Sequence, residues 1–262
     1  MSNLISVRNP HSVLAALERR PADVESIQVS ASGGDEAWKK VAELARRLKI
    51  PVTNGTPDRG GGANDRGRRG GRDDSAKDSG RASLNEARIH PKEPISAEDL
   101  FADARERAGG KGVWLALDSL TDPHNVGAIF RIAGFFGIEG ILITAERSAP
   151  LTHTVYDVSC GGIETVPHTE QVNLQRAFEI AKEAGLWILG TSEHAREGYL
   201  TLERDRPWLV VIGNEEKGMR RLTAEACDVL TGIPPLGEVT SLNASVATGV
   251  LISRLMSTGG GR

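Results

Sequence analysis

The stretch Ile233-Pro-Pro-Leu-Gly-Glu-Val-Thr-Ser-Leu-Asn-Ala-Ser-Val-Ala-Thr-Gly-Val-Leu251 is the most informative part of this chain. A Pro-Pro/Gly turn ends an apolar segment, and Ser241, Asn243 and Ser245 then open an apolar helix. Ser and Asn are ordinary helix caps, so a well-capped core helix would explain any one of them. Three of them in one turn beside a rigid loop instead indicate a helix start that faces a ligand, because the first N–H groups of a helix are unpaired.

The next cluster upstream, Gly213-Asn-Glu-Glu-Lys-Gly-Met-Arg, follows an apolar strand predicted for residues 208–212. Gly213 and Gly218 allow the backbone to approach a ligand closely, and Glu215 comes just after the strand. The spacing is not a P-loop, because a P-loop has Lys and then Ser or Thr after its second glycine. Taken alone, this cluster is also compatible with an ordinary strand–loop–helix turn.

A third polar cluster, Asp122-Pro-His-Asn-Val-Gly-Ala-Ile-Phe-Arg, follows an apolar strand predicted for residues 113–118. Asn125 lies at the entry of a helix predicted for residues 126–136, and Arg131 lies inside it. The helix is otherwise apolar, so Arg131 must either pair with an acid or bind a functional anion. A structural salt bridge would explain this cluster if it is considered alone.

Apolar strands alternate with helices throughout this part of the chain, which predicts an α/β fold with a parallel sheet covered on both faces. Ligands of such sheets bind beyond the C-terminal ends of the strands, and the polar clusters fall there. The predicted strands span residues 113–118, 140–144, 186–191 and 208–212, and the predicted helices span residues 126–136 and 173–184.

Residues 1–56 predict a separate small α/β domain, which part of residues 83–95 is expected to complete. Its predicted helices span residues 11–17 and 38–48, and its predicted strands span residues 26–30 and 50–53.

Residues 57–82 are rich in Arg, Gly and Asp and contain no large apolar side chain, which predicts a disordered insertion. Its arginines resemble those of flexible RNA-binding segments, but aspartates dilute the charge and no aromatic residue is interleaved for stacking. A passive solvated linker is therefore the favoured interpretation.

A connector, residues 83–111, contains a helix predicted for residues 97–108 and leads to a domain of residues 112–262.

The composition is that of an ordinary globular protein of 262 residues with a net charge of −3. Because no apolar run of about 18 residues and no secretory segment occur, we expect a cytoplasmic protein without a membrane span. The two cysteines and six scattered histidines lack metal-ligand spacing, which predicts reduced thiols and no metal site. His124, His153 and His168 are expected at the surface or in hydrogen bonds. The near-neutral charge leaves RNA binding open, because a local basic face suffices for it.

Taken in their order along the chain and with their spacing, the three polar clusters resemble the three motifs of the SpoU (TrmH-like) RNA 2′-O-methyltransferases of the SPOUT superfamily. The resemblance covers the chain from about residue 112 to its C-terminus. The segment of residues 147–167 is most similar to the branch that methylates a guanosine in large-subunit ribosomal RNA. The first domain resembles the small RNA-binding domain of that family, although Asn9 stands where the family usually has Gly.

The resemblance implies that the C-terminal segment threads through a loop to form a trefoil knot, and that two catalytic domains form a homodimer. It also implies S-adenosylmethionine as the cofactor and RNA as the partner. The cofactor would be bound by Thr191, Gly213, Ile233 and Leu242. The catalytic neighbourhood would consist of Asn125, Arg131, Glu215, Asn243 and Ser245.

Two alternatives remain at this point. A transfer-RNA ribose methyltransferase of the same fold would carry the same three clusters. A catalytically silent RNA-binding protein of ribosome assembly would keep the fold, although it predicts loss of motif residues, and Asn125, Arg131, Glu215 and Asn243 are all present.

Overall fold

A computed structural model describes residues 4–30, 35–55, 85–192, 195, 197–214 and 218–257. The chain divides into two compact units, Met1–His90 and Pro91–Arg262. The expected insertion of residues 57–82 and the predicted site residue Glu215 lie outside the described residues. Among the described helices, none is both long enough and apolar enough to cross a bilayer.

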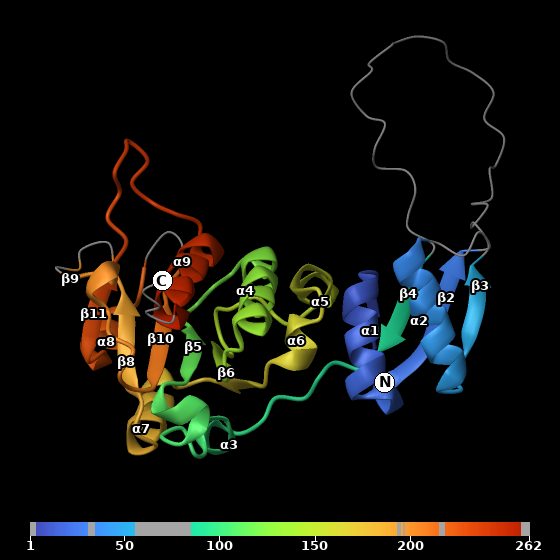
Figure 1. The fold of residues 1–262 in the computed structure, drawn as a ribbon, viewed down its shortest axis with the longest axis horizontal. Helices are drawn as coiled ribbons and strands as arrows, with labels where there is room; N and C mark the ends of the chain where they lie inside the picture. The colour runs from blue at the N-terminus through green and yellow to red at the C-terminus, as the bar shows by residue number, and fades with distance from the viewer. Residues whose placement is uncertain are drawn as a thin grey trace, which may run out of the picture. The chain divides into compact units, whose positions relative to one another are not determined.

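The first unit contains a four-stranded sheet in the order β1-β4-β2-β3, where β4 is antiparallel to both neighbours and β2 and β3 are parallel (Figure 1). Its buried core includes Leu17, Ile27, Trp38 and Ile89. Its elements are β1 (Ile5–Val7), α1 (Pro10–Arg19), η1 (Pro21–Asp23), β2 (Val24–Ser30), α2 (Glu36–Arg47), β3 (Val52–Gly55) and β4 (Glu86–Ile89).

Asn9 caps α1. Its side-chain oxygen accepts hydrogen bonds from the backbone N–H groups of His11 and Ser12, at 2.9 and 3.4 Å. Asn is among the best N-cap residues, so Asn9 satisfies N–H groups at the start of α1.

The second unit contains a sheet whose described strands number seven, in the order β7-β6-β5-β10-β8-β11-β9, and every neighbouring pair is parallel. The predicted parallel α/β fold is confirmed. The strands are β5 (Val113–Leu117), β6 (Gly140–Thr144), β7 (His168–Gln171), β8 (Trp187–Thr191), β9 (Glu197–Gly198), β10 (Trp208–Ile212) and β11 (Val229–Gly232). The helices are α3 (Ala97–Phe101), η2 (Arg107–Gly110), α4 (Pro123–Phe136), α5 (His153–Ser159), α6 (Gly162–Thr165), α7 (Leu174–Glu183), η3 (Tyr199–Thr201), α8 (Arg221–Ala226) and α9 (Ala244–Met256).

The central strands β5, β6 and β10 are buried along their whole length because helices cover both faces of the sheet. Alternate residues of a strand point to opposite faces. Trp114 and Ala116 of β5 belong to one core together with Phe101 of α3 and Phe178 of α7. Helices α5, α6 and α9 all pack against α4, as Figure 1 shows.

The helix predicted for residues 97–108 ends at Phe101, so this prediction is wrong in length. Ala102 has an extended ψ of 138° and Asp103 has a left-handed φ of 54°, which together end the helix. Phe101 and Ala104 are nevertheless both buried, because the turn after the helix keeps them on the face that packs under the sheet.

Candidate functional site

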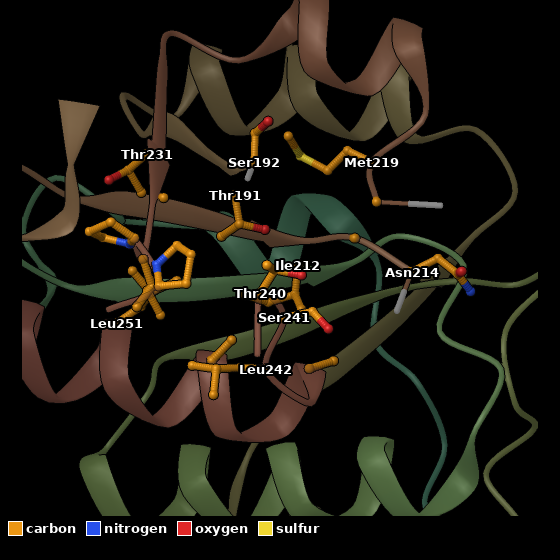
Figure 2. A pocket seen from close by; sticks show the side chains of 18 of the residues that line it. Thr191, Ser192, Ile212, Asn214, Met219, Thr231, Thr240, Ser241, Leu242 and Leu251 are labelled. Atoms are coloured by element: carbon orange, nitrogen blue, oxygen red, sulfur yellow. The ribbon is translucent and has the colours of Figure 1, made fainter. Parts of the chain in front are cut away.

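A cavity of about 550 Å³ opens at the C-terminal ends of β8, β10 and β11 (Figure 2). The loop of residues 233–242 and helix α9 form its other wall. Its volume lies in the usual range for small-molecule and cofactor sites. The lining residues come from three stretches that follow the three strands, and they include Thr191, Ser192, Ile212, Gly213, Asn214, Gly218, Met219, Thr231, Gly232, Ile233, Pro234, Pro235, Leu242 and Leu251.

The four residues expected to hold a cofactor, Thr191, Gly213, Ile233 and Leu242, all line this one cavity. They come from three different strand ends and one loop, so the fold brings together positions up to 51 residues apart. The Thr191 hydroxyl donates to the Val211 carbonyl at 2.9 Å, which ties β8 to β10 at the cavity edge. Leu242 is half exposed, so it presents apolar surface that a ligand could cover.

Two glycines let backbone, rather than side chains, form part of the wall. A Cβ atom on Gly213 would lie 2.5 Å from the carbonyl carbon of Gly218 and from the nitrogen of Met219. A Cβ atom on Gly232 would lie 2.5 Å from the Ser192 carbonyl oxygen. Both positions therefore require glycine, and the packed backbone leaves little side-chain bulk at the strand ends.

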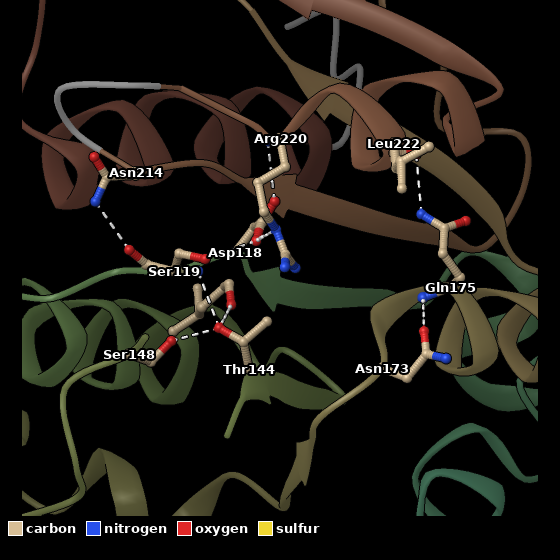
Figure 3. Close-up of polar contacts among 10 residues, drawn as sticks. Asp118, Ser119, Thr144, Ser148, Asn173, Gln175, Asn214, Arg220 and Leu222 are labelled. Atoms are coloured by element: carbon tan, nitrogen blue, oxygen red, sulfur yellow. Dashed lines mark hydrogen bonds and ion pairs between the residues drawn. The ribbon is translucent and has the colours of Figure 1, made fainter. Parts of the chain in front are cut away.

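The loop after β10 is tied to the end of β5 by polar contacts that Figure 3 shows. The Asn214 amide donates to the Ser119 carbonyl at 2.9 Å. The Arg220 guanidinium donates through Nε to the buried Asp118 carboxylate at 2.8 Å. Of these two residues, the sequence reasoning missed Asp118. An acid at the end of an entirely apolar strand was the signal that could have identified Asp118.

The predicted catalytic residues Asn125, Asn243 and Ser245 form one hydrogen-bonded group. Asn125 is buried on α4, and its side-chain oxygen accepts from the Asn243 amide at 2.8 Å. Asn243 caps α9, because its own oxygen accepts from the backbone N–H and the hydroxyl of Ser245, at 2.9 and 2.6 Å. Since Leu242 and Ala244 line the cavity, this group joins α4 to the cavity wall.

Arg131 lies on the third turn of α4, exposed to solvent and outside the cavity lining. Within the described part of the chain it has neither an ion pair nor a side-chain hydrogen bond. The structural salt bridge considered for Arg131 is therefore not seen there. Its guanidinium is therefore exposed and available to an anion.

Among the described residues near the cavity, Cys227 is a thiol whose protonation is shifted by its surroundings. Burial, followed by the charge of Asp228, raises the pKa of the Cys227 thiol to about 12, so this thiol stays protonated. Among the described residues, no group of three or more His, Cys, Asp or Glu side chains is arranged to hold a metal ion. Within the described structure, the cavity lining therefore offers backbone groups and neutral polar side chains for binding and orientation.

His168 differs from its expected surface or hydrogen-bonded setting. Its side chain is buried on β7 with both ring nitrogens unpaired within the described structure, and its ring contacts that of Phe130 edge-on. Burial, assisted by the positive charge of Lys92, lowers the pKa of His168 to about 4. The histidine is therefore a neutral core residue at physiological pH.

Comparison with known proteins shows which family this chain resembles. The SpoU rRNA Methylase family model matches residues 112–253. A Pseudomonas aeruginosa protein named 23S rRNA (guanosine-2′-O-)-methyltransferase RlmB is 34% identical over 259 residues, which cover 98% of this chain and 97% of that protein. A Bacillus subtilis protein named putative TrmH family tRNA/rRNA methyltransferase YacO is 43% identical over 166 residues, which cover 63% of this chain and 66% of that protein.

The fold is also that of a solved structure. The crystal structure of the SpoU methyltransferase AviRb from Streptomyces viridochromogenes, in complex with AdoMet, superposes with a TM-score of 0.72 at 20% identity. The superposition covers 97% of this chain and 89% of that one.

Proposed function

Because the chain belongs to the SpoU rRNA methylase family, we propose that it methylates the ribose 2′-hydroxyl of a guanosine in large-subunit ribosomal RNA, with S-adenosylmethionine as the methyl donor. The observation that carries this proposal is the single cavity at three strand ends, which collects all four residues expected to hold the donor. Relatives that match almost the whole chain and are named 23S rRNA guanosine methyltransferases support the choice of substrate. Ribosomal RNA as substrate is consistent with action in the cytoplasm.

The cavity fits S-adenosylmethionine in size and in chemistry. Leu242 supplies exposed apolar surface of the kind that a purine ring covers, while the Thr191 hydroxyl and nearby backbone supply polar groups. Gly213 and Gly232 keep side chains away from the strand ends, where the backbone would contact the donor. When bound, S-adenosylmethionine supplies an electrophilic methyl group together with its leaving group, so the protein need not generate either.

Arg131 is proposed to bind the phosphate beside the target ribose and to stabilise the negative charge that develops on its 2′-oxygen. A guanidinium is planar, always charged, and can hold a phosphate through two parallel hydrogen bonds. It is not a base, because it does not release its proton at the pH of the reaction. The exposure of Arg131, without an acidic partner in the described structure, supports this role. Glu215 remains the proposed partner that orients it.

Asn125, Asn243 and Ser245 are proposed to fix the geometry of the site rather than to move protons. Their polar atoms bond to one another and to the first turn of α9. A fixed α9 start keeps Leu242 at the cavity, and positioning of reactants is a large part of what a transfer enzyme supplies.

Three further proposals concern the molecule beyond the cavity. We propose that the first unit binds RNA, that the C-terminal segment threads through a loop to form a trefoil knot, and that two copies form a homodimer. The sheet order, in which β10 lies between β5 and β8, supports a non-sequential path of the kind a knot requires. Exposed apolar side chains on α4 and α9, Phe135 and Val246, support a covered face between two copies.

The proposal is tested by incubating the purified protein with tritiated S-adenosylmethionine and either ribosomal RNA or transfer RNA from cells that lack the protein. Label incorporated into large-subunit ribosomal RNA is the expected result. Label confined to transfer RNA would favour the alternative of a transfer-RNA ribose methyltransferase of the same fold. Calorimetry without RNA checks binding of the donor, and a complete absence of binding would favour a silent RNA-binding protein.

A further inference from the structure

The chain buries a carboxylate beside the cavity that the proposed mechanism does not use. Asp118 directly follows β5, and its side chain is 0% exposed. One carboxylate oxygen accepts from Arg220 Nε at 2.8 Å and from the Ser119 hydroxyl at 3.1 Å. The other accepts from the backbone N–H of Arg220 at 3.3 Å. A buried carboxylate persists only when it is paired and hydrogen-bonded, so these contacts hold Arg220 at the end of β5.

Arg220 is the residue next to Met219, which lines the cavity together with Gly218. At the other stem of the same loop, the Asn214 amide donates to the Ser119 carbonyl at 2.9 Å. Asn214 and Gly218 exchange two backbone hydrogen bonds, at 2.9 and 3.1 Å, which close the neck of the loop. Asn214 and Arg220, at the two ends of this loop, are therefore attached to the adjacent residues Ser119 and Asp118 (Figure 3).

The attachment point is itself braced. Ser119 has a left-handed φ of 64°, which a residue with a side chain adopts only when its surroundings enforce it. Its backbone N–H donates to the Thr144 hydroxyl at 3.0 Å, and that hydroxyl also contacts the Ser148 hydroxyl at 2.5 Å. The end of β5 is thereby fixed to the end of β6, on the side of the site away from the cavity.

We propose that Asp118 is a positioning residue for the methyl donor: through Arg220, it holds Gly218 and Met219 in place as one wall of the cavity. Asp118 itself does not line the cavity, so it acts through its partner. This inference rests on the proposed function, because it assumes that the cavity binds S-adenosylmethionine.

Asp228 offers a matched control. Like Asp118, it is an acid that lies next to a strand and accepts hydrogen bonds. Its carboxylate accepts from the Ile188 backbone N–H at 2.8 Å and from Lys182 Nζ at 2.8 Å. It directly precedes β11 and so lies at the N-terminal ends of the strands, whereas the cavity lies at their C-terminal ends. It is not among the cavity residues. Asp228→Asn therefore removes an ion pair whose acid is 29% exposed and lies outside the proposed wall.

The test compares Asp118→Asn, Arg220→Gln, the double variant and Asp228→Asn in the full chain. Calorimetry gives the Kd for S-adenosylmethionine, and methyl transfer to ribosomal RNA gives kcat at saturating donor. We expect Asp118→Asn to raise the Kd by roughly tenfold while kcat at saturation changes less than about twofold. The double variant binds no more weakly than Asp118→Asn, because both changes break the same contact. Asp228→Asn leaves the Kd unchanged.

A folded Asp118→Asn variant with the wild-type Kd would overturn the inference, and so would fully additive effects in the double variant. If Asp118→Asn does not fold, Arg220→Gln provides the same comparison, because the Arg220 side chain is 41% exposed and tolerates replacement more readily. An unchanged Kd for Arg220→Gln then overturns the inference. A wild-type chain that does not bind S-adenosylmethionine would instead contradict the proposed function.

Discussion

At the scale of single residues, Arg131 is the side chain whose chemistry can be tested most simply. Arg131→Lys keeps the positive charge but loses the planar guanidinium that can hold a phosphate through two hydrogen bonds. We expect kcat/KM for methyl transfer to fall by about tenfold or more, with the Kd for S-adenosylmethionine unchanged, since Arg131 does not line the cavity. Arg176→Lys is the control, because Arg176 is an exposed arginine of α7 that pairs with Glu179. Wild-type turnover by Arg131→Lys would rule out a role for the guanidinium geometry.

His168 predicts a pH dependence of stability. Its pKa is about 4 in the folded chain against 6.5 for an unperturbed histidine, so between these values the unfolded chain binds more protons than the folded one. The contribution of His168 to the free energy of unfolding should therefore be fully present above about pH 6.5. The free energy of unfolding should fall as the pH is lowered toward 4, by about 3 kcal/mol in all.

Urea unfolding at several pH values measures this dependence. His168→Leu should remove that part of the pH profile, whereas replacement of the exposed His124 should leave the profile as it is. An identical acid-side slope in His168→Leu and the wild type would show that other groups cause the loss of stability.

The sequence placed Asn125 and Asn243 individually at the starts of helices, but the contacts among the polar residues around the cavity could not be predicted from it. Asn125 and Asn243 are 118 positions apart, and Asp118 and Arg220 are 102 positions apart. Local pattern places each at the end of a strand or the start of a helix. Which of them bond to one another depends on the register of the parallel strands and on the packing of α4 against α9, and neither leaves a local signature.

At the scale of secondary-structure elements, the role of the start of α9 can be tested by a single substitution. Asn243→Ala removes the cap of α9 and its bond to Asn125, which should lower the free energy of unfolding by about 1–2 kcal/mol. It should also weaken binding of S-adenosylmethionine, because Leu242 and Ala244 line the cavity on either side of Asn243.

Asn173→Ala is the control for that change. Asn173 caps α7 with the same pattern, accepting from the backbone N–H groups of Gln175 and Arg176, but lies outside the cavity lining. Denaturant unfolding and calorimetry should show a loss of stability in both variants and a change of Kd only in Asn243→Ala. Equal Kd values in the two variants would count against a role of the α9 start in binding.

Most elements of the second unit follow from the sequence because they are strongly periodic or continuously apolar. Strands such as Val113–Leu117 and Trp208–Ile212 have no polar residue to mislead the prediction. The helix after Ser96 was predicted too long, because its apolar spacing continues to Ala104 although the backbone turns at Ala102 and Asp103. Periodicity records which side chains are buried, and a tight turn can bury them as well as a helix can.

At the scale of the whole molecule, the proposed homodimer is testable through the exposed face of α4. Phe135 is 83% exposed and contacts the ring of Phe136. Sedimentation should give twice the chain mass of 28.0 kDa for the wild type, and Phe135→Asp should shift the equilibrium toward the monomer. Val172→Asp, at a 66% exposed position after β7, should remain dimeric. A monomeric wild type at micromolar concentration would contradict the dimer.

The overall topology could not be obtained from periodicity alone. Alternating strands and helices predict a parallel sheet, but not an order in which β10 lies between β5 and β8. The family motifs did not give that order either, because they only grouped three separate stretches of the chain at one site. The cavity at the strand ends then follows from the general rule that parallel sheets bind ligands beyond their C-terminal edge.

The most direct test is to map ribose methylation in large-subunit ribosomal RNA from cells with and without the gene. We predict that one guanosine loses its 2′-O-methyl group in the deletion strain and regains it when the wild-type chain is restored, but not when Arg131→Lys is expressed in its place at the same level. An unchanged pattern of ribose methylation in ribosomal RNA after deletion would contradict the proposed function.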